Sequence, residues 1–74
     1  MNIGKQLKDA RIESGYTQEQ IAEQLDVSRQ TISSWENSRT FPDIVSVVSL
    51  SDIYDVSLDV LIKGDGKYWV RTKN

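Results

Sequence analysis

The chain has 74 residues and a formal net charge of −2, and it contains neither cysteine nor histidine. This length supports one hydrophobic core, and the absence of cysteine excludes a disulfide scaffold. No apolar run approaches the roughly 20 residues of a membrane span, and no charged and then apolar leader opens the chain, so we expect a cytoplasmic protein.

The acidic and basic residues are unevenly distributed. Residues 42–62 contain four acids and no lysine or arginine. Because phosphate groups favour a basic surface, this segment should face away from any nucleic acid. Basic contacts would come from residues 5–11, from residues 29–39 and from the tail after residue 62.

Two short helices are expected first. The first covers Ile3–Ser14, because apolar residues recur at helical spacing and Gly15 supplies a stop. The second begins at Thr17, because Thr17-Gln18-Glu19-Gln20 has the form of a capping box. Its apolar face is formed by Ile21, Ala22 and Leu25.

A three-residue break at residues 26–28 separates the second helix from a third. Ser28 can cap this third helix, which we expect to extend from Arg29 to about Asn37. A connection this short forces two packed helices to cross sharply, which is the geometry of a helix-turn-helix unit.

Two more helices are expected in the acidic segment. Phe41-Pro42-Asp43 opens the fourth, with the proline and the acid in its first turn. The side chains that share its face are Ile44, Val47, Leu50, Ser51 and Tyr54. A fifth short helix contains Leu58, Leu61 and Ile62 and stops at Gly64. Residues 64–74 remain open among a strand, a packed tail and a linker.

The third helix has two chemically different faces. A polar arc contains Arg29, Gln30, Ser33, Ser34 and Asn37, and the opposite side contains Thr31, Ile32 and Trp35. Arginine suits guanine O6 and N7, glutamine suits adenine N6 and N7, and serine serves either pattern, so the polar arc matches base reading. Alternatively, the arc is only a solvated surface. Trp35 is expected to anchor the core rather than to stack on unpaired bases.

The segment TQEQIAEQLDVSRQTISSWEN resembles the phage repressor and Cro-like (Xre-type) helix-turn-helix family. The resemblance continues through FPDIVSVVSLSDIYDVSLDVLI. It implies an all-α, compact five-helix, lambda-repressor-like DNA-binding domain at residues 1–65 with a short C-terminal tail at residues 66–74. The family usually has glycine in the turn, where this chain has Asp26. Aspartate tolerates a left-handed conformation, so we expect a small cost in stability and an unchanged fold.

The resemblance also implies roles for individual residues. Those facing bases are Arg29, Gln30 and Ser34, with Ser33 as a secondary candidate. Those binding phosphates are Gln18, Ser28, Asn37, Arg39 and Thr40. Arg39 and Thr40 have an ordinary polar loop as their alternative role. Arg11 matches a position that pairs with Glu36 and remains partly available to a phosphate, and the alternative is a surface ion pair.

The resemblance implies a transcriptional regulator, most often a repressor, that binds a double-stranded DNA operator as a homodimer. Candidate dimer residues are Val56, Leu58, Ile62 and the Tyr68-Trp69-Val70 cluster, all of which also suit an intramolecular core. The rival interpretation is a helical protein-interaction module, antitoxin-like or bridging, whose acidic fourth and fifth helices bind a basic partner. We expect no catalytic residues, no cofactor, no metal and no small-molecule substrate, because the chain has no nucleophile motif and no glycine-rich phosphate loop.

Overall fold

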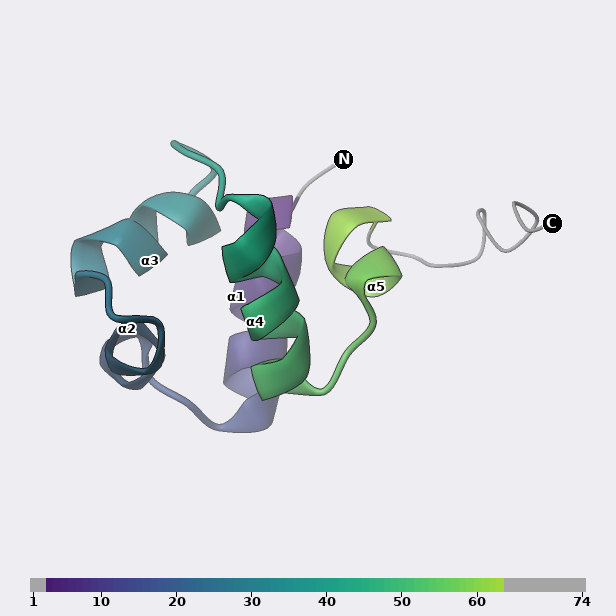
Figure 1. Cartoon of the computed structure of the whole chain (residues 1–74), viewed down its shortest axis with the longest axis horizontal. Coiled ribbons are helices and arrows are strands. Elements are labelled where there is room, and N and C mark those ends of the chain that lie inside the picture. Colours follow the sequence, from purple (N-terminus) through teal and green to yellow (C-terminus); the bar gives the residue numbers. More distant parts are fainter. Residues whose placement is uncertain (1–2, 64–74) are drawn as a thin grey trace, which may run out of the picture.

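The structure, a computed structural model, describes residues 3–63, and all the regular secondary structure in this range is α-helix. Five helices follow one another along the chain (Figure 1). Their bounds are α1 Ile3–Ser14, α2 Gln18–Leu25, α3 Arg29–Glu36, α4 Ile44–Tyr54 and α5 Leu58–Lys63. The predicted five-helix, all-α fold is confirmed, whereas the predicted boundary between residues 65 and 66 lies outside the described residues.

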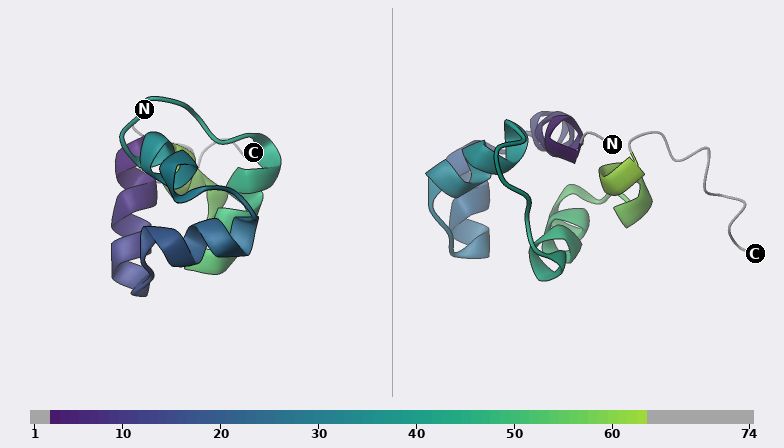
Figure 2. Two further views of the ribbon diagram at one scale, coloured as in Figure 1. Left: turned by 90° about the vertical axis from the view of Figure 1, so that its left-hand side faces the viewer. Right: turned by 90° about the horizontal axis from the view of Figure 1, so that it is seen from above.

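The helices pack around α1, which contacts α3, α4 and α5, while α2 packs chiefly against α3. In Figure 2, left, α2 extends across the view and α3 is seen almost end-on, so the two helices cross steeply. A single core joins all five helices, consisting of Ile3, Leu7, Ile21, Ala22, Ile32, Trp35, Val47, Leu50, Tyr54 and Leu61. Within residues 3–63, none of the helices combines the length and the apolar character that crossing a membrane requires.

Local signals set the ends of the first two helices. Gly15 has φ 83°, the left-handed conformation that the predicted stop requires. At the start of α2, the Gln20 amide donates to Thr17 Oγ1 at 3.1 Å, and the Thr17 amide donates to Gln20 Oε1 at 2.8 Å. The predicted capping box is therefore confirmed, and it satisfies two amides that a helix start would otherwise leave unpaired.

The start of α4 differs from the prediction in two respects. Asp43 is the N-cap and Pro42 precedes it, so neither residue lies in the first turn. The Asp43 carboxylate accepts from the Ser46 hydroxyl at 2.7 Å, and this hydrogen bond holds the pKa of Asp43 below its ordinary value. Ile44, predicted to share a face with Val47, Leu50 and Tyr54, is 65% exposed, whereas those three are buried. It stands at the edge of the buried arc, in the first turn of the helix.

The predicted dimer residues divide into two groups. Val56, Leu58 and Ile62 are half-buried and pack against the core of their own chain, as the intramolecular alternative had it. The Tyr68-Trp69-Val70 cluster lies outside the described residues.

Candidate nucleic-acid interface

The turn between α2 and α3 sets the position of the candidate interface. Asp26 adopts φ 58° and ψ 46°, and the Val27 amide donates to the Ala22 carbonyl at 3.0 Å. This left-handed residue reverses the chain where the resembling family usually has glycine, and the fold is unchanged, as predicted. Ser28 then caps α3 by accepting from the Thr31 amide at 3.1 Å. The helix-turn-helix geometry predicted from the three-residue break is therefore present.

α3 has the two faces that its sequence predicts. Ile32 and Trp35 are buried, at 2% and 6% exposure, so tryptophan serves as a core anchor. Arg29 and Gln30 are exposed at the other side of the helix. The two serines, Ser33 and Ser34, are half-buried. An exposed arginine and glutamine in the first turn, above two partly exposed serines, provide donors and acceptors suited to base edges.

Four side chains from three helices form one hydrogen-bonded network beneath this face. Arg11 donates to both carboxylate oxygens of Glu36, from Nε to Oε2 at 2.7 Å and from Nη2 to Oε1 at 3.1 Å. Gln18 donates from Nε2 to Glu36 Oε1 at 3.0 Å. Arg29 in turn donates from Nη1 to Gln18 Oε1 at 3.0 Å. The network thus connects a buried carboxylate with an exposed arginine of the candidate base-reading arc.

The network fixes the orientation of the Gln18 amide. Its NH₂ group faces the carboxylate and its oxygen faces the guanidinium, which is the only arrangement in which both hydrogen bonds form. One hydrogen-bond donor of Arg29 is used by Gln18, and its other guanidinium donors remain available to a ligand. The structure therefore brings together a predicted phosphate contact and a predicted base contact.

The alternative of a surface ion pair between Arg11 and Glu36 is wrong. Their side chains are 13% and 2% exposed, and Arg11 Nη1 also donates to the Tyr16 carbonyl at 3.0 Å. Glu36 hydrogen bonding raises the pKa of Arg11 above its ordinary value, so this side chain stays charged. Burial raises the pKa of the neighbouring Tyr54 hydroxyl, and the Glu36 charge raises it further. The phosphate contact predicted for Arg11 would use the small exposed part of its guanidinium.

The segment after α3 holds the remaining predicted phosphate contacts. Asn37 caps α3 and donates from Nδ2 to Ser33 Oγ at 3.2 Å. The Arg39 amide donates to the Ser34 carbonyl at 2.9 Å, so the chain folds back over the end of the helix. The side chains of Asn37, Arg39 and Thr40 are exposed. They therefore lie on the same segment, one helix length from Ser28 and Arg29.

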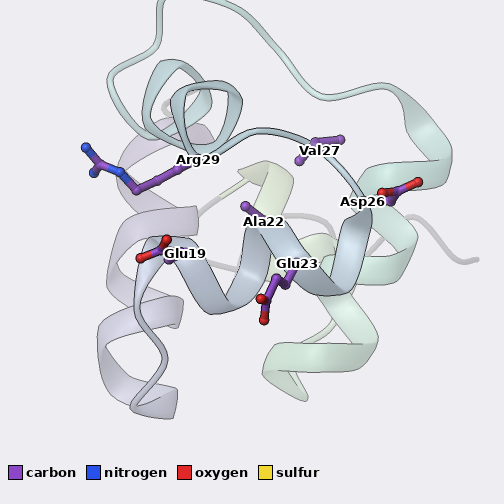
Figure 3. A pocket seen from close by; sticks show the side chains of 6 residues that line it. All are labelled: Glu19, Ala22, Glu23, Asp26, Val27 and Arg29. Atoms are coloured by element: carbon purple, nitrogen blue, oxygen red, sulfur yellow. The ribbon is translucent and has the colours of Figure 1, made fainter.

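A second surface, beside α2, is acidic. A shallow hollow is lined by Glu19, Ala22, Glu23, Asp26, Val27 and Arg29 (Figure 3). Figure 3 shows Arg29 at one end of this hollow and Asp26 at the other, with Glu19 below Arg29. Three carboxylates disfavour a phosphate group here, so an anionic ligand would approach from the polar arc of α3 instead.

Sequence analysis did not predict that Gln18 bonds to both Glu36 and Arg29. Residues 18 and 36 are far apart along the chain, and no pattern in the sequence signals a contact between them.

Among the described residues, no group of three or more acidic, histidine or cysteine side chains is placed to hold a metal ion.

Comparison with known proteins gave consistent matches. A model of the helix-turn-helix family matches residues 7–61. The chain is 40% identical over 74 residues to the HTH-type transcriptional regulator ImmR of Bacillus subtilis, covering all of this chain and 56% of that protein. It is 38% identical over 65 residues to the HTH-type transcriptional activator BcrR of Enterococcus faecalis, covering 88% of this chain and 32% of that protein. The SPbeta prophage-derived uncharacterized HTH-type transcriptional regulator YonR of Bacillus subtilis is 38% identical over 62 residues, with 84% and 57% covered. The chain thus spans between about a third and somewhat more than half of the length of these relatives.

Proposed function

Since the chain belongs to the helix-turn-helix family, we propose that it binds double-stranded DNA with sequence preference and regulates transcription. The observation that carries the proposal is the polar face of α3, exposed at Arg29 and Gln30 and anchored from behind by buried Trp35. A helix of this kind enters the major groove with its N-terminal residues against base edges.

In the proposed complex, base edges are read by Arg29, Gln30, Ser34 and Ser33. Phosphates flanking the groove are bound by Gln18, Ser28, Asn37, Arg39, Thr40 and the exposed part of Arg11. The bond from Gln18 to Glu36 supports this assignment, because it holds the glutamine beside Arg29 at one end of α3. Contacts at both ends of the helix would then set its register in the groove.

The proposed biological act is occupancy of an operator in the cytoplasm by two copies of the chain. One helix reads only a few base pairs, and two copies on half-sites about 34 Å apart supply the specificity that one lacks. Such occupancy represses transcription when the operator overlaps a promoter. The relative that is named as an activator is a longer protein, and this chain covers 32% of it. Binding alone accounts for this function, and no catalytic step is proposed.

Selection of bound duplexes from a random DNA pool tests the proposal. With an enriched duplex, the double variant Arg29→Ala/Gln30→Ala should weaken binding at least about tenfold, because each bidentate base contact discriminates by about 1–3 kcal/mol. The matched control is Asp55→Asn in the acidic segment, where asparagine tolerates the φ of 56°. This control should bind DNA as the wild type does.

The rival interaction module makes the opposite prediction. The DNA-binding proposal is overturned if no duplex is enriched at low ionic strength. It is also overturned if Asp55→Asn weakens binding to the duplex while the α3 double variant does not. The acidic fourth and fifth helices would then be the surface to examine.

A further inference from the structure

Four large apolar side chains are exposed in the first turns of α4 and in the loop just before it. Phe41 is 69% exposed, Ile44 65%, Val45 69% and Val48 42%. We name these four residues the α4 apolar patch. The only other large apolar side chain exposed among the described residues is Ile12 on α1, at 58%. Single exposed apolar residues are ordinary, whereas neighbouring ones mark an interaction surface, and Ile44 and Val45 each lie within one helical turn of Val48.

The patch follows from the way α4 divides its surface. Val47, Leu50 and Tyr54 face the core, the opposite stripe contains Val45, Val48 and then Asp52, and Ile44 lies at the edge between the two faces. The first two turns of this stripe are apolar and the third is acidic. Before the patch, two residues ahead of Phe41, lies the exposed Arg39. The order of exposed side chains along the chain is therefore a cation, the apolar patch and an anion.

This order makes the surface complementary to itself. A two-fold axis through the α4 apolar patch would place patch on patch, and it would bring Arg39 of each copy toward Asp52 of the other. We propose that the α4 apolar patch is the surface through which two copies of this chain contact each other on DNA. This inference rests on the proposed function, in which two copies occupy one operator, and it names the surface through which the two copies contact each other.

The position of the patch agrees with this role. The loop that joins α3 to α4, between the teal and green helices in Figure 1, contains Asn37, Arg39 and Thr40 and leads directly into the patch. A second copy docked at this loop would lie beside the same duplex. Its own α3 would then be available to a neighbouring half-site.

The size of the patch predicts a weak contact. Four partly exposed side chains offer on the order of 400 Å² per copy, about half of what each partner buries in a standard interface. The protein should therefore be monomeric in dilute solution. Two copies should pair when neighbouring half-sites on DNA raise their effective concentration.

The test compares duplexes with one half-site and with two inverted half-sites, obtained by selection with the full chain. Wild-type protein should bind the two-site duplex cooperatively, about tenfold or more above independent binding. Val45→Glu should remove the cooperativity and leave affinity for the single half-site unchanged. Ile12→Glu introduces the same charge at an exposed isoleucine away from the patch, and it should retain the cooperativity. Circular dichroism verifies that both variants fold.

Sedimentation at several concentrations without DNA provides an independent readout. Wild-type protein should show the onset of dimers at the highest concentrations, and Val45→Glu should not. If cooperativity persists in Val45→Glu, or if two-site binding is independent in the wild type, the assignment of the patch is overturned while single half-site binding leaves the proposed function intact. Loss of single half-site binding by the wild type would instead contradict the proposed function itself.

Discussion

At the scale of residues, Glu36 is the charged side chain on which the interface depends most. Its side chain is 2% exposed, and its carboxylate is held by Arg11 and Gln18. A buried carboxylate is stable only with its hydrogen bonds and its counter-charge in place. The same contacts orient Gln18 toward Arg29, so one buried residue supports both the fold and the candidate base-reading arc.

Glu36→Gln is therefore expected to destabilise the domain by about 3 kcal/mol, because it leaves the Arg11 charge buried without a counter-charge. Urea unfolding monitored by circular dichroism measures the loss. Glu19→Gln, which changes the same group at an exposed site of α2, should alter stability by less than about 0.5 kcal/mol. Equal effects of the two substitutions would show that the buried pair contributes little.

At the scale of elements, the glycine inside α1 and the glycine that follows its end serve different purposes. Gly4 is buried where α1 crosses the end of α3, and a Cβ built there would lie 2.7 Å from the Trp35 carbonyl oxygen and 2.8 Å from that of Glu36. Gly15 has open space around it, but its φ is 83°. The first glycine permits close packing of two helices, and the second permits the left-handed end of one helix.

These two roles predict different responses to substitution. Gly4→Ala should destabilise the domain by about 1–3 kcal/mol, because a backbone carbonyl must move to admit the methyl group. Gly15→Ala should cost about 1 kcal/mol, owing to its positive φ. Asparagine at position 15 should recover much of this loss, since asparagine tolerates the left-handed conformation. Thermal unfolding of the three variants decides the matter, and a neutral Gly4→Ala would contradict the close approach of α1 and α3.

At the scale of the whole molecule, charge is segregated although the net charge is only −2. Acidic side chains lie along α2 and at both ends of α4, whereas the exposed Arg29 begins α3 and the exposed Arg39 follows its end. An acidic protein can therefore offer a local surface suited to phosphate. Because most proposed phosphate contacts are uncharged, few counterions would be released on binding.

Binding to a selected two-site duplex should accordingly weaken with salt along a shallow line. With Arg39 and part of Arg11 as the cations at phosphates in each copy, we expect a log–log slope of about −2 to −4 for two copies. Arg39→Gln should make the slope shallower by about 0.9 per copy, and Lys8→Gln on α1 should leave it unchanged. Titrations at several potassium chloride concentrations measure both, and a slope unaffected by Arg39→Gln would remove this residue from the phosphate contacts.

The sequence by itself determined the features that depend on neighbours along the chain. Helix ends follow from Thr17, Ser28 and Gly15, and the two faces of α3 follow from helical spacing. Capping and periodicity act over three or four residues, so a linear pattern contains them. The helix-turn-helix was predictable for the same reason.

Only the tertiary structure decided which side chains meet across helices and which stay uncovered. The pair of Arg11 and Glu36 was predicted, but its burial was not, and the bond from Glu36 to Gln18 was not predicted at all. Ile44 was grouped with Val47, Leu50 and Tyr54 from its spacing, yet it is exposed while they are buried. Helical spacing gives the direction in which a side chain points, whereas burial depends on whether another element lies in that direction, which requires the packing of the whole chain.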